Sequence, residues 1–353
     1  MTTKPAGRVA PFTIGEMAVQ PGTRRTVDLP VSVFADHTPA HMAVHVVHGA
    51  RPGPTVFVSA AVHGDEVIGV EIVRRLLRQP QLARLRGTLL AVPVVNAFGF
   101  LAHSRYLPDR RDLNRSFPGH PRGSLAARLA YLFLEQVAAR ATLGIDLHSG
   151  AVHRSNLPQL RVSASDEGAM AMARTFAPPV ILRSALRDGS LRAAAEQRGI
   201  PMLLYEAGEA LRFEEFGIRA GVSGCLRVLH ALDMIAARGV PKARIVPSLA
   251  TYSAWLRAPV GGLVRTFREL GETVAEGETI AVVSDPLGTS ETIVQARFGG
   301  LVIGRSALPV ANEGDPLLHV ARVARPDEAS AHIENLSELL ADDDRLADDG
   351  LMD

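Results

Sequence analysis

The sequence predicts an α/β fold, a mixed and mostly parallel sheet flanked by helices, with a small all-β unit near the C-terminal end. Along residues 55–237, apolar runs of strand length alternate with segments whose apolar residues recur every three or four positions. Several of these runs end in polar clusters, as strands do at the ligand-binding edge of an open sheet. From about Tyr252 the pattern changes to short apolar runs separated by glycines, which predicts the β unit.

Length and composition favour a protein of more than one unit. The 353 residues are too many for one small core, and 47% apolar with 21% charged residues is typical of a soluble globular protein. We place a first domain at residues 1–250, with a β-rich segment at 1–54, a β unit at 251–325 and an acidic tail at 326–353. A net charge of +1 gives no electrostatic signature of a nucleic-acid or membrane partner.

Cysteine and targeting patterns narrow the chemistry and the location. Cys225 is the single cysteine, so a disulfide framework and a Cys-based zinc site are excluded. The chain has neither a signal-peptide pattern at its start nor a run of 18 apolar residues, and we therefore expect a cytoplasmic protein.

Four histidines, His37, His41, His45 and His48, recur at about four-residue spacing in the N-terminal segment. On a helix they would form a metal site. Apolar and polar residues alternate over 41–47, however, which favours a strand with polar side chains turned outward.

The stretch from Thr55 to Arg78 reads as strand, sharp turn and helix. The apolar run 55–62 breaks at residues 63–66, and a helical apolar pattern follows over 67–78. His63 and Glu66, three residues apart in the turn, can reach one point and suit a zinc ion with an open position. The alternative is a helix-capping Asp65 beside a surface glutamate.

The remaining elements of the first domain continue the alternation. The pattern predicts strands at 87–95, 144–150, 180–182 and 201–205, helices at 124–139, 190–198 and 217–237, and an arginine-rich loop at 101–119.

Polar residues close these strands, and in a parallel sheet the strand ends share one edge. His148 supplies a third metal ligand there, and Asp146, two positions earlier on the same strand face, can accept an imidazole N–H. Glu206 ends the strand 201–205, with Glu209 as a rival acidic residue.

The β unit contains a repeat. Residues 261–264 recur as 299–302, and 274–277 are echoed at 310–314, which suggests a small pseudo-symmetric sandwich or flattened barrel. It resembles biotinyl and lipoyl carrier domains, but residues 253–323 contain no lysine to carry a group. The acidic residues after Arg325 are typical of a solvated end.

Four motifs in order resemble the succinylglutamate desuccinylase and aspartoacylase family, which is related to the zinc carboxypeptidases. They are residues 63–66 (HGDE), 112–115 (DLNR), 146–148 (DLH) and the strand-end Glu206. The resemblance spans residues 40–323 and implies a zinc-carboxypeptidase-like fold with a β appendage.

The resemblance also implies roles for individual residues. His63, Glu66 and His148 fall on the family's ligands to one zinc ion, and Glu206 on its general base. Arg105 matches the arginine that supports the carbonyl oxygen, and Asn114 with Arg115 the pair that grips the substrate carboxylate. The loop between them is longer than in aspartoacylase, which makes Arg110 or Arg111 an alternative for sharing the role of Arg105. The favoured interpretation is that these two are solvated or pair with Asp109 and Asp112.

These expectations amount to a zinc-dependent amidohydrolase that removes an acyl group from an N-acyl amino acid or a related small carboxylate. One alternative is a carboxypeptidase-like zinc peptidase acting on short peptides, which a cleft left open by the β unit would favour. The other is a non-catalytic metal- or metabolite-binding protein. Unpaired strand edges in the β unit suggest a homo-oligomer.

Overall fold

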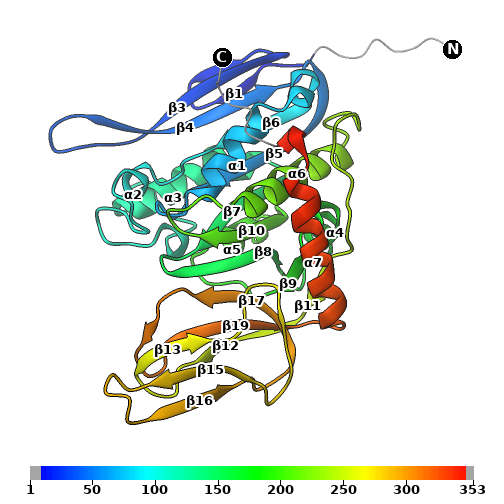
Figure 1. Cartoon of the computed structure of the whole chain (residues 1–353). Helices are drawn as coiled ribbons and strands as arrows, with labels where there is room; N and C mark the ends of the chain where they lie inside the picture. The colour runs from blue at the N-terminus through cyan, green and yellow to red at the C-terminus, as the bar shows by residue number, and fades with distance from the viewer. Residues whose placement is uncertain (1–8, 347–353) are drawn as a thin grey trace.

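The computed structural model describes residues 9–346, and its centre is a sheet of 13 strands (Figure 1). The main path through this sheet runs in the order β12-β19-β17-β8-β10-β7-β5-β6-β4-β3. Its strands are β3 (Thr23–Val33), β4 (Pro39–His48), β5 (Arg51–Ala60), β6 (Arg86–Val92), β7 (Leu143–Gly150), β8 (Arg154–Val162), β9 (Val180–Arg183), β10 (Met202–Glu209), β11 (Ser248–Ala250), β12 (Tyr252–Arg257), β14 (Thr273–Val274), β17 (Gly300–Ser306) and β19 (Pro316–Arg322).

Parallel pairing on the main path is concentrated at the centre of the sheet. Strands β10, β7, β5 and β6 are consecutive neighbours and run parallel to one another, whereas β8 and β4 flank them antiparallel. Strand β4 includes the histidine-rich stretch, so the strand prediction there is confirmed. The predicted α/β class is confirmed as well, with antiparallel strands extending the parallel centre on both sides.

Helices cover both faces of the sheet. Helices α1, α4, α6 and α7 pack in one apolar core, and α2, α3, α5 and the hairpin β1–β2 pack in the other. The bounds are β1 (Phe12–Ile14), β2 (Met17–Val19), α1 (Ile68–Leu77), η1 (Pro80–Arg84), α2 (Ala97–Leu101), η2 (Leu113–Arg115), α3 (Leu125–Gln136), η3 (Ala138–Arg140), α4 (Glu167–Phe176), α5 (Leu191–Glu196), α6 (Glu215–Ala231), α7 (Pro326–Ala341) and η4 (Asp344–Leu346).

Local sequence explains where these helices begin. The Ser124 and Ser190 hydroxyls each accept a hydrogen bond from a backbone N–H in the first turn of α3 and α5. In α1, a Cβ atom at Gly69 would lie 2.8 Å from the Cβ atoms of Ala60 and Leu147. The absence of a side chain at Gly69 therefore lets α1 pack directly on β5 and β7. This packing places the first turn of α1 at the carboxyl edge of the sheet.

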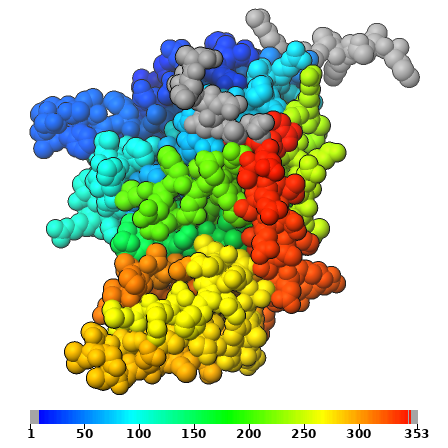
Figure 2. Space-filling view, in the orientation of Figure 1, coloured from blue at the N-terminus to red at the C-terminus, as the bar shows by residue number. Residues whose placement is uncertain are grey.

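The C-terminal β region is a two-layer structure. One layer is formed by β12, β19 and β17, and the other is a four-stranded sheet in the order β16-β15-β13-β18. The strands of the second layer are β13 (Gly262–Thr266), β15 (Thr279–Ser284), β16 (Glu291–Gln295) and β18 (Val310–Ala311). Because β17 also pairs with β8, the sheet continues without a break into the α/β part, and the two parts lie in close contact (Figure 2).

The repeat seen in the sequence takes the form of a strand exchange. Val274 of the first repeat pairs with Gly300 of the second, and Ala311 of the second pairs with Gly262 of the first. Each repeat therefore obtains an edge strand from the other. This reciprocal pairing fits the predicted pseudo-symmetric sandwich.

Helix α7 was not anticipated, because the acidic composition after Arg325 suggested a solvated end. The helix runs along the surface from the β region toward α6 (Figures 1 and 2) and buries Ala329, Ile333, Leu336 and Leu340. Its acidic residues lie on the exposed face. The prediction of a solvated end was wrong because it rested on the acidic composition and not on the apolar residues that recur along one side of the helix.

None of the helices within residues 9–346 is long and apolar enough to cross a membrane.

Replacing Leu336 by alanine should lower the free energy of unfolding by about 2–4 kcal/mol, because it opens a cavity between α7 and the core. Leu339 in the same helix is 47% exposed, so Leu339→Ala should cost under about 0.5 kcal/mol. Urea unfolding followed by circular dichroism measures both. Equal effects for the two variants would contradict the packing described for α7.

Candidate active site

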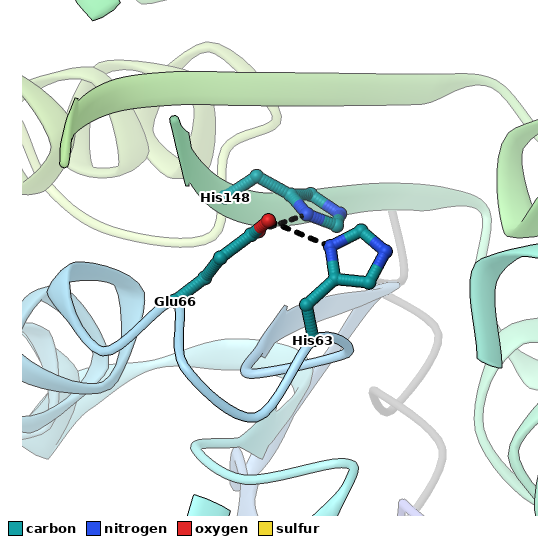
Figure 3. A group of neighbouring side chains, drawn as sticks. All are labelled: His63, Glu66 and His148. Atoms are coloured by element: carbon teal, nitrogen blue, oxygen red, sulfur yellow. Dashed lines mark hydrogen bonds and ion pairs between the residues drawn. The ribbon is translucent and has the colours of Figure 1, made fainter. Parts of the chain in front are cut away.

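Three side chains converge where β5 and β7 reach the edge of the sheet (Figure 3). His63 and Glu66 lie in the turn between β5 and α1, and His148 lies within β7. The turn is tight: the backbone N–H of Glu66 donates to the carbonyl of His63 at 3.2 Å. All three side chains are buried, so the residues predicted as metal ligands are brought together.

The Glu66 carboxylate bridges the two imidazoles. Its Oε1 lies 2.7 Å from Nδ1 of His63, and its Oε2 lies 2.6 Å from Nδ1 of His148. One ligand atom from each residue lies within 4.8 Å of the other two. Two imidazole nitrogens and one carboxylate oxygen at this spacing fit a divalent metal ion that keeps an open coordination position.

The far nitrogen of each imidazole faces a second carboxylate. Asp112 Oδ1 lies 3.1 Å from Nε2 of His63, and Asp146 Oδ2 lies 2.7 Å from Nε2 of His148. The predicted contact between Asp146 and His148 is confirmed, and the Ser59 hydroxyl holds Asp146 at 2.7 Å. Carboxylates placed this way fix the ring orientation of metal-binding histidines.

Charge balance keeps the cluster ionised. Burial alone would raise the pKa of the Glu66 carboxyl, but the two imidazoles outweigh burial and hold that pKa well below its usual value. Burial likewise opposes the charged form of His148, yet Asp146 and Glu66 raise its pKa well above the ordinary value. In the trio His63, Glu66 and His148, the Glu66 carboxylate is therefore negatively charged and lies between two imidazole nitrogens that are either protonated or able to coordinate a metal ion.

Glu206 and Glu209 take different directions from β10. Glu206 lines the cavity beside the trio, where its Oε2 accepts a hydrogen bond from Asn156 Nδ2 at 2.6 Å. Glu209 Oε1 instead accepts from the backbone N–H of His153 at 3.0 Å. The strand was expected to end at Glu206, but it continues to Glu209 through a register shift. That irregularity separates the two carboxylates.

Arg105 is the loop arginine nearest the trio. Its Nε and Nη2 donate to Asp112 Oδ2 at 3.1 and 2.8 Å, and its Nη1 donates to Glu66 Oε1 at 3.3 Å. Arg110 and Arg111, which competed with it in the sequence, are both exposed. Asp112, expected as a partner of those two, pairs with Arg105 instead.

Asn114 and Arg115 lie in η2 on the cavity wall, as a substrate-binding pair would require. The buried Asn114 accepts the backbone N–H of Leu191 through Oδ1 at 2.9 Å, which ties η2 to the start of α5. Arg115 is exposed and donates to the carbonyl of Asn114.

The cavity has a volume of about 410 Å³, the size of a small-molecule site. Sequence reasoning missed several of its wall residues, because they come from elements without a recognisable motif. These are Asn156 and Arg161 on β8, Arg187 before α5, Arg192 on α5 and Trp255 on β12.

Sequence similarity to known proteins identifies the family of this chain. The family model described as the succinylglutamate desuccinylase/aspartoacylase catalytic domain matches residues 52–232, just over half of the chain. The chain belongs to this family. The match covers His63, Glu66, His148 and Glu206.

Individual relatives of the succinylglutamate desuccinylase/aspartoacylase family agree with this. An N-alpha-acetyl-L-2,4-diaminobutyric acid deacetylase from Halomonas elongata is 28% identical over 235 residues, 57% of this chain and 69% of the relative. A succinylglutamate desuccinylase from a Silicibacter species superposes with a TM-score of 0.77 at 25% identity, covering 92% of this chain and 100% of the other. The product-bound ectoine utilization protein EutE (DoeB) from Ruegeria pomeroyi gives 0.76 at 25% identity, covering 84% and 95%.

Gly64 lies in the turn between His63 and Glu66, and replacing it tests whether this turn sets the geometry of the site. A Cβ atom there would lie 2.0 Å from the carbonyl carbon of Gly99, so Gly64→Ala should push the turn away from α2 and separate His63 from Glu66. We expect binding of divalent zinc or cobalt, followed by equilibrium dialysis, to weaken at least about tenfold. Gly168→Ala, at an exposed position in α4, serves as control and should leave the metal affinity unchanged. Unaltered metal binding in Gly64→Ala would contradict the assigned geometry.

Proposed function

We propose that this protein is a zinc-dependent amidohydrolase that removes the acyl group from an N-acyl amino acid or a related small carboxylate. The observation that carries the proposal is the convergence of His63, Glu66 and His148 beside Glu206 in one cavity of about 410 Å³. Membership of the succinylglutamate desuccinylase/aspartoacylase family supports the same reaction class. We place this activity in the cytoplasm, as the sequence predicts.

His63, Glu66 and His148 would hold the zinc ion, with Asp112 and Asp146 fixing the two imidazoles. A zinc ion bound there supplies Lewis-acid activation of a water molecule and of the scissile carbonyl. Its donor set of two nitrogens and one oxygen is typical of catalytic rather than structural zinc sites.

The other residues of the cavity wall transfer the proton, stabilise the developing negative charge and bind the substrate carboxylate. Glu206, on the cavity wall, takes a proton from the attacking water and passes it to the departing amine. Arg105, held by Asp112, stabilises the negative charge that develops on the carbonyl oxygen. Asn114 and Arg115 bind the substrate carboxylate, which orients the amide toward Glu206.

The C-terminal β region favours this reaction over peptide hydrolysis. Trp255 of β12 forms part of the cavity wall, so the β region closes a side that a peptidase would leave open to longer chains. The named activity of the Halomonas elongata relative, deacetylation of a small N-acetyl amino acid, also supports a small substrate.

Glu206→Gln should abolish amide hydrolysis while leaving zinc bound, because the amide keeps the shape of the side chain but cannot take a proton. We expect a loss of at least about 100-fold in kcat, measured as amine release from a panel of formyl, acetyl and succinyl amino acids. Glu209→Gln, the control on the same strand, should retain activity, since Glu209 is turned toward His153. Loss of activity only in Glu209→Gln would reassign the base.

Asp146→Asn should weaken zinc binding by roughly 10- to 100-fold, because the neutral amide no longer supports the imidazole of His148. A competition titration against a chromophoric chelator measures the affinity, and chelator-treated protein should lose activity that added zinc restores. The exposed Asp28→Asn variant provides a control of equal charge change. If Asp146→Asn bound zinc as tightly as that control, His148 would not be a ligand supported by Asp146.

A further inference from the structure

Strand β8 changes its register against β10 beside the cavity. Glu206 of β10 lies opposite Gln159 of β8. Gly208, two residues later on β10, lies opposite Asn156, which is three residues before Gln159 on β8. Over this stretch β8 therefore carries one extra residue, which makes it a β-bulge. Bulges change the direction of nearby side chains and are frequent next to active sites.

The extra residue reverses which side chains of β8 face the cavity. After it, Arg161 lines the cavity and Leu160 packs in the core. Before it, Asn156 lines the cavity and Leu157 packs in the core. Because a slip of one residue exchanges the two faces of a strand, an unbroken β8 that kept Arg161 on the wall would turn Asn156 away. Pro158 lies within the bulge, where it has no N–H to donate to the ladder.

Both oxygens of the Glu206 carboxylate face side chains of β8. Asn156 Nδ2 donates to Oε2 at 2.6 Å, and Arg161 Nε lies 3.3 Å from Oε1. The contact with Arg161 is not an aligned hydrogen bond, since its buried Nε–H has no acceptor within the described residues. An ionised carboxylate only accepts hydrogen bonds, so the amide N–H of Asn156 is the group that suits Oε2.

Glycines flank Asn156 on both neighbouring strands. Gly208 of β10 is its partner on one side, and Gly304 of β17 is its partner on the other. A Cβ atom at Gly304 would lie 3.1 Å from Oδ1 of Asn156 and 3.0 Å from Cβ of His319. Asn156 is 5% exposed, so packing holds its amide as well as the hydrogen bond does. The C-terminal β region, through β17 and β19, is part of that packing.

The guanidinium of Arg161 competes with Asn156 for Glu206. Arginine and a carboxylate pair most strongly when two parallel hydrogen bonds form, which requires both carboxylate oxygens. The hydrogen bond from Asn156 engages Oε2, one of the two oxygens that such a pair needs. A carboxylate with both oxygens bound to a guanidinium is less able to accept a proton from water. Asn156 therefore keeps Glu206 available to the cavity.

We propose that Asn156 is a positioning residue for the general base: its side-chain amide holds the Glu206 carboxylate on the cavity wall and prevents a two-bond pair with Arg161. This assignment rests on the proposed function, in which Glu206 takes a proton from the attacking water. Asn156 acts through Glu206 and not on the reacting atoms. Its packing against Gly304 gives the C-terminal β region a part in placing the base.

The test compares two variants of the zinc-loaded full-length protein with the wild type. Asn156→Leu keeps the approximate size of the side chain but removes the N–H donor. Asn156→Gln keeps the donor on a side chain that is longer by one methylene. Amine release from formyl, acetyl and succinyl amino acids gives kcat and KM, and chelator competition gives the zinc affinity. Crystal structures of the wild type and of Asn156→Leu show the direction of Glu206.

We expect Asn156→Leu to lower kcat roughly 10- to 100-fold, the effect of losing one hydrogen bond to a charged group. Its KM and zinc affinity should stay within about twofold of the wild type, because only the placement of the base changes. In its crystal structure Glu206 should form a two-bond pair with Arg161. Asn156→Gln should retain more of kcat than Asn156→Leu. Asn335→Leu makes the same change at an exposed position of α7 and should leave kcat unaltered.

An unmoved Glu206 in Asn156→Leu would overturn the proposal, as would a wild-type kcat in that variant. A raised KM with unchanged kcat would make Asn156 a substrate-binding residue, and weakened zinc binding would make it a support of the metal site. Either result would also overturn the positioning role.

The crystal structures need no turnover, so the two proposals can fail separately. A displaced Glu206 in Asn156→Leu, together with a wild-type protein that hydrolyses no acylated amino acid, would retain the positioning by Asn156 and reject the amidohydrolase. Hydrolysis by the wild type, together with an unmoved Glu206 in the variant, would do the reverse.

Discussion

The site depends on one buried carboxylate held between two imidazoles. His63 and Glu66 come from the turn between β5 and α1 and His148 comes from β7, so the three side chains join this turn to the neighbouring strand. The parallel pairing of β5 with β7, which places Ala60 beside Leu147, sets the distance between the two histidines. Their geometry thus follows from the strand pairing, from the tight turn that carries His63 and Glu66, and from the close packing of α1 on the sheet.

The parts of this arrangement that repeat with secondary structure could be predicted from sequence. Asp146 and His148 are two positions apart, and strand geometry alone turns them to one face, where they hydrogen-bond. The helical apolar pattern after residue 66 likewise predicted α1 and the placement of Glu66. The sequence favoured Glu206 over Glu209 because Glu206 directly follows the apolar run 201–205, and in the structure a register shift in β10 sends Glu209 toward His153.

What could not be predicted arises from tertiary packing. The charge-balancing role of Asp112 appears only when η2 folds back over His63. Arg161, Arg187 and Arg192 of the cavity wall come from β8, from the segment before α5 and from α5 itself, and no sequence spacing marks them among the many arginines of this chain. Helix α7 was hidden for a related reason: its acidic residues dominated the composition, while the four buried positions that bind it to the core were too few to alter the average.

The exchange of edge strands between the two repeats has a consequence for synthesis of the chain. Because Gly262 finds its partner at Ala311 and Val274 finds its partner at Gly300, neither half of the β region can complete its sheet alone. During translation the first half therefore keeps an unpaired strand edge until the residues of β18 have left the ribosome. Trp255 also pairs with His319 on β19, so the cavity wall closes only near the end of that process. A nascent chain that stalls before this point would present an open site and an exposed sheet edge, the state in which chaperones protect proteins from association.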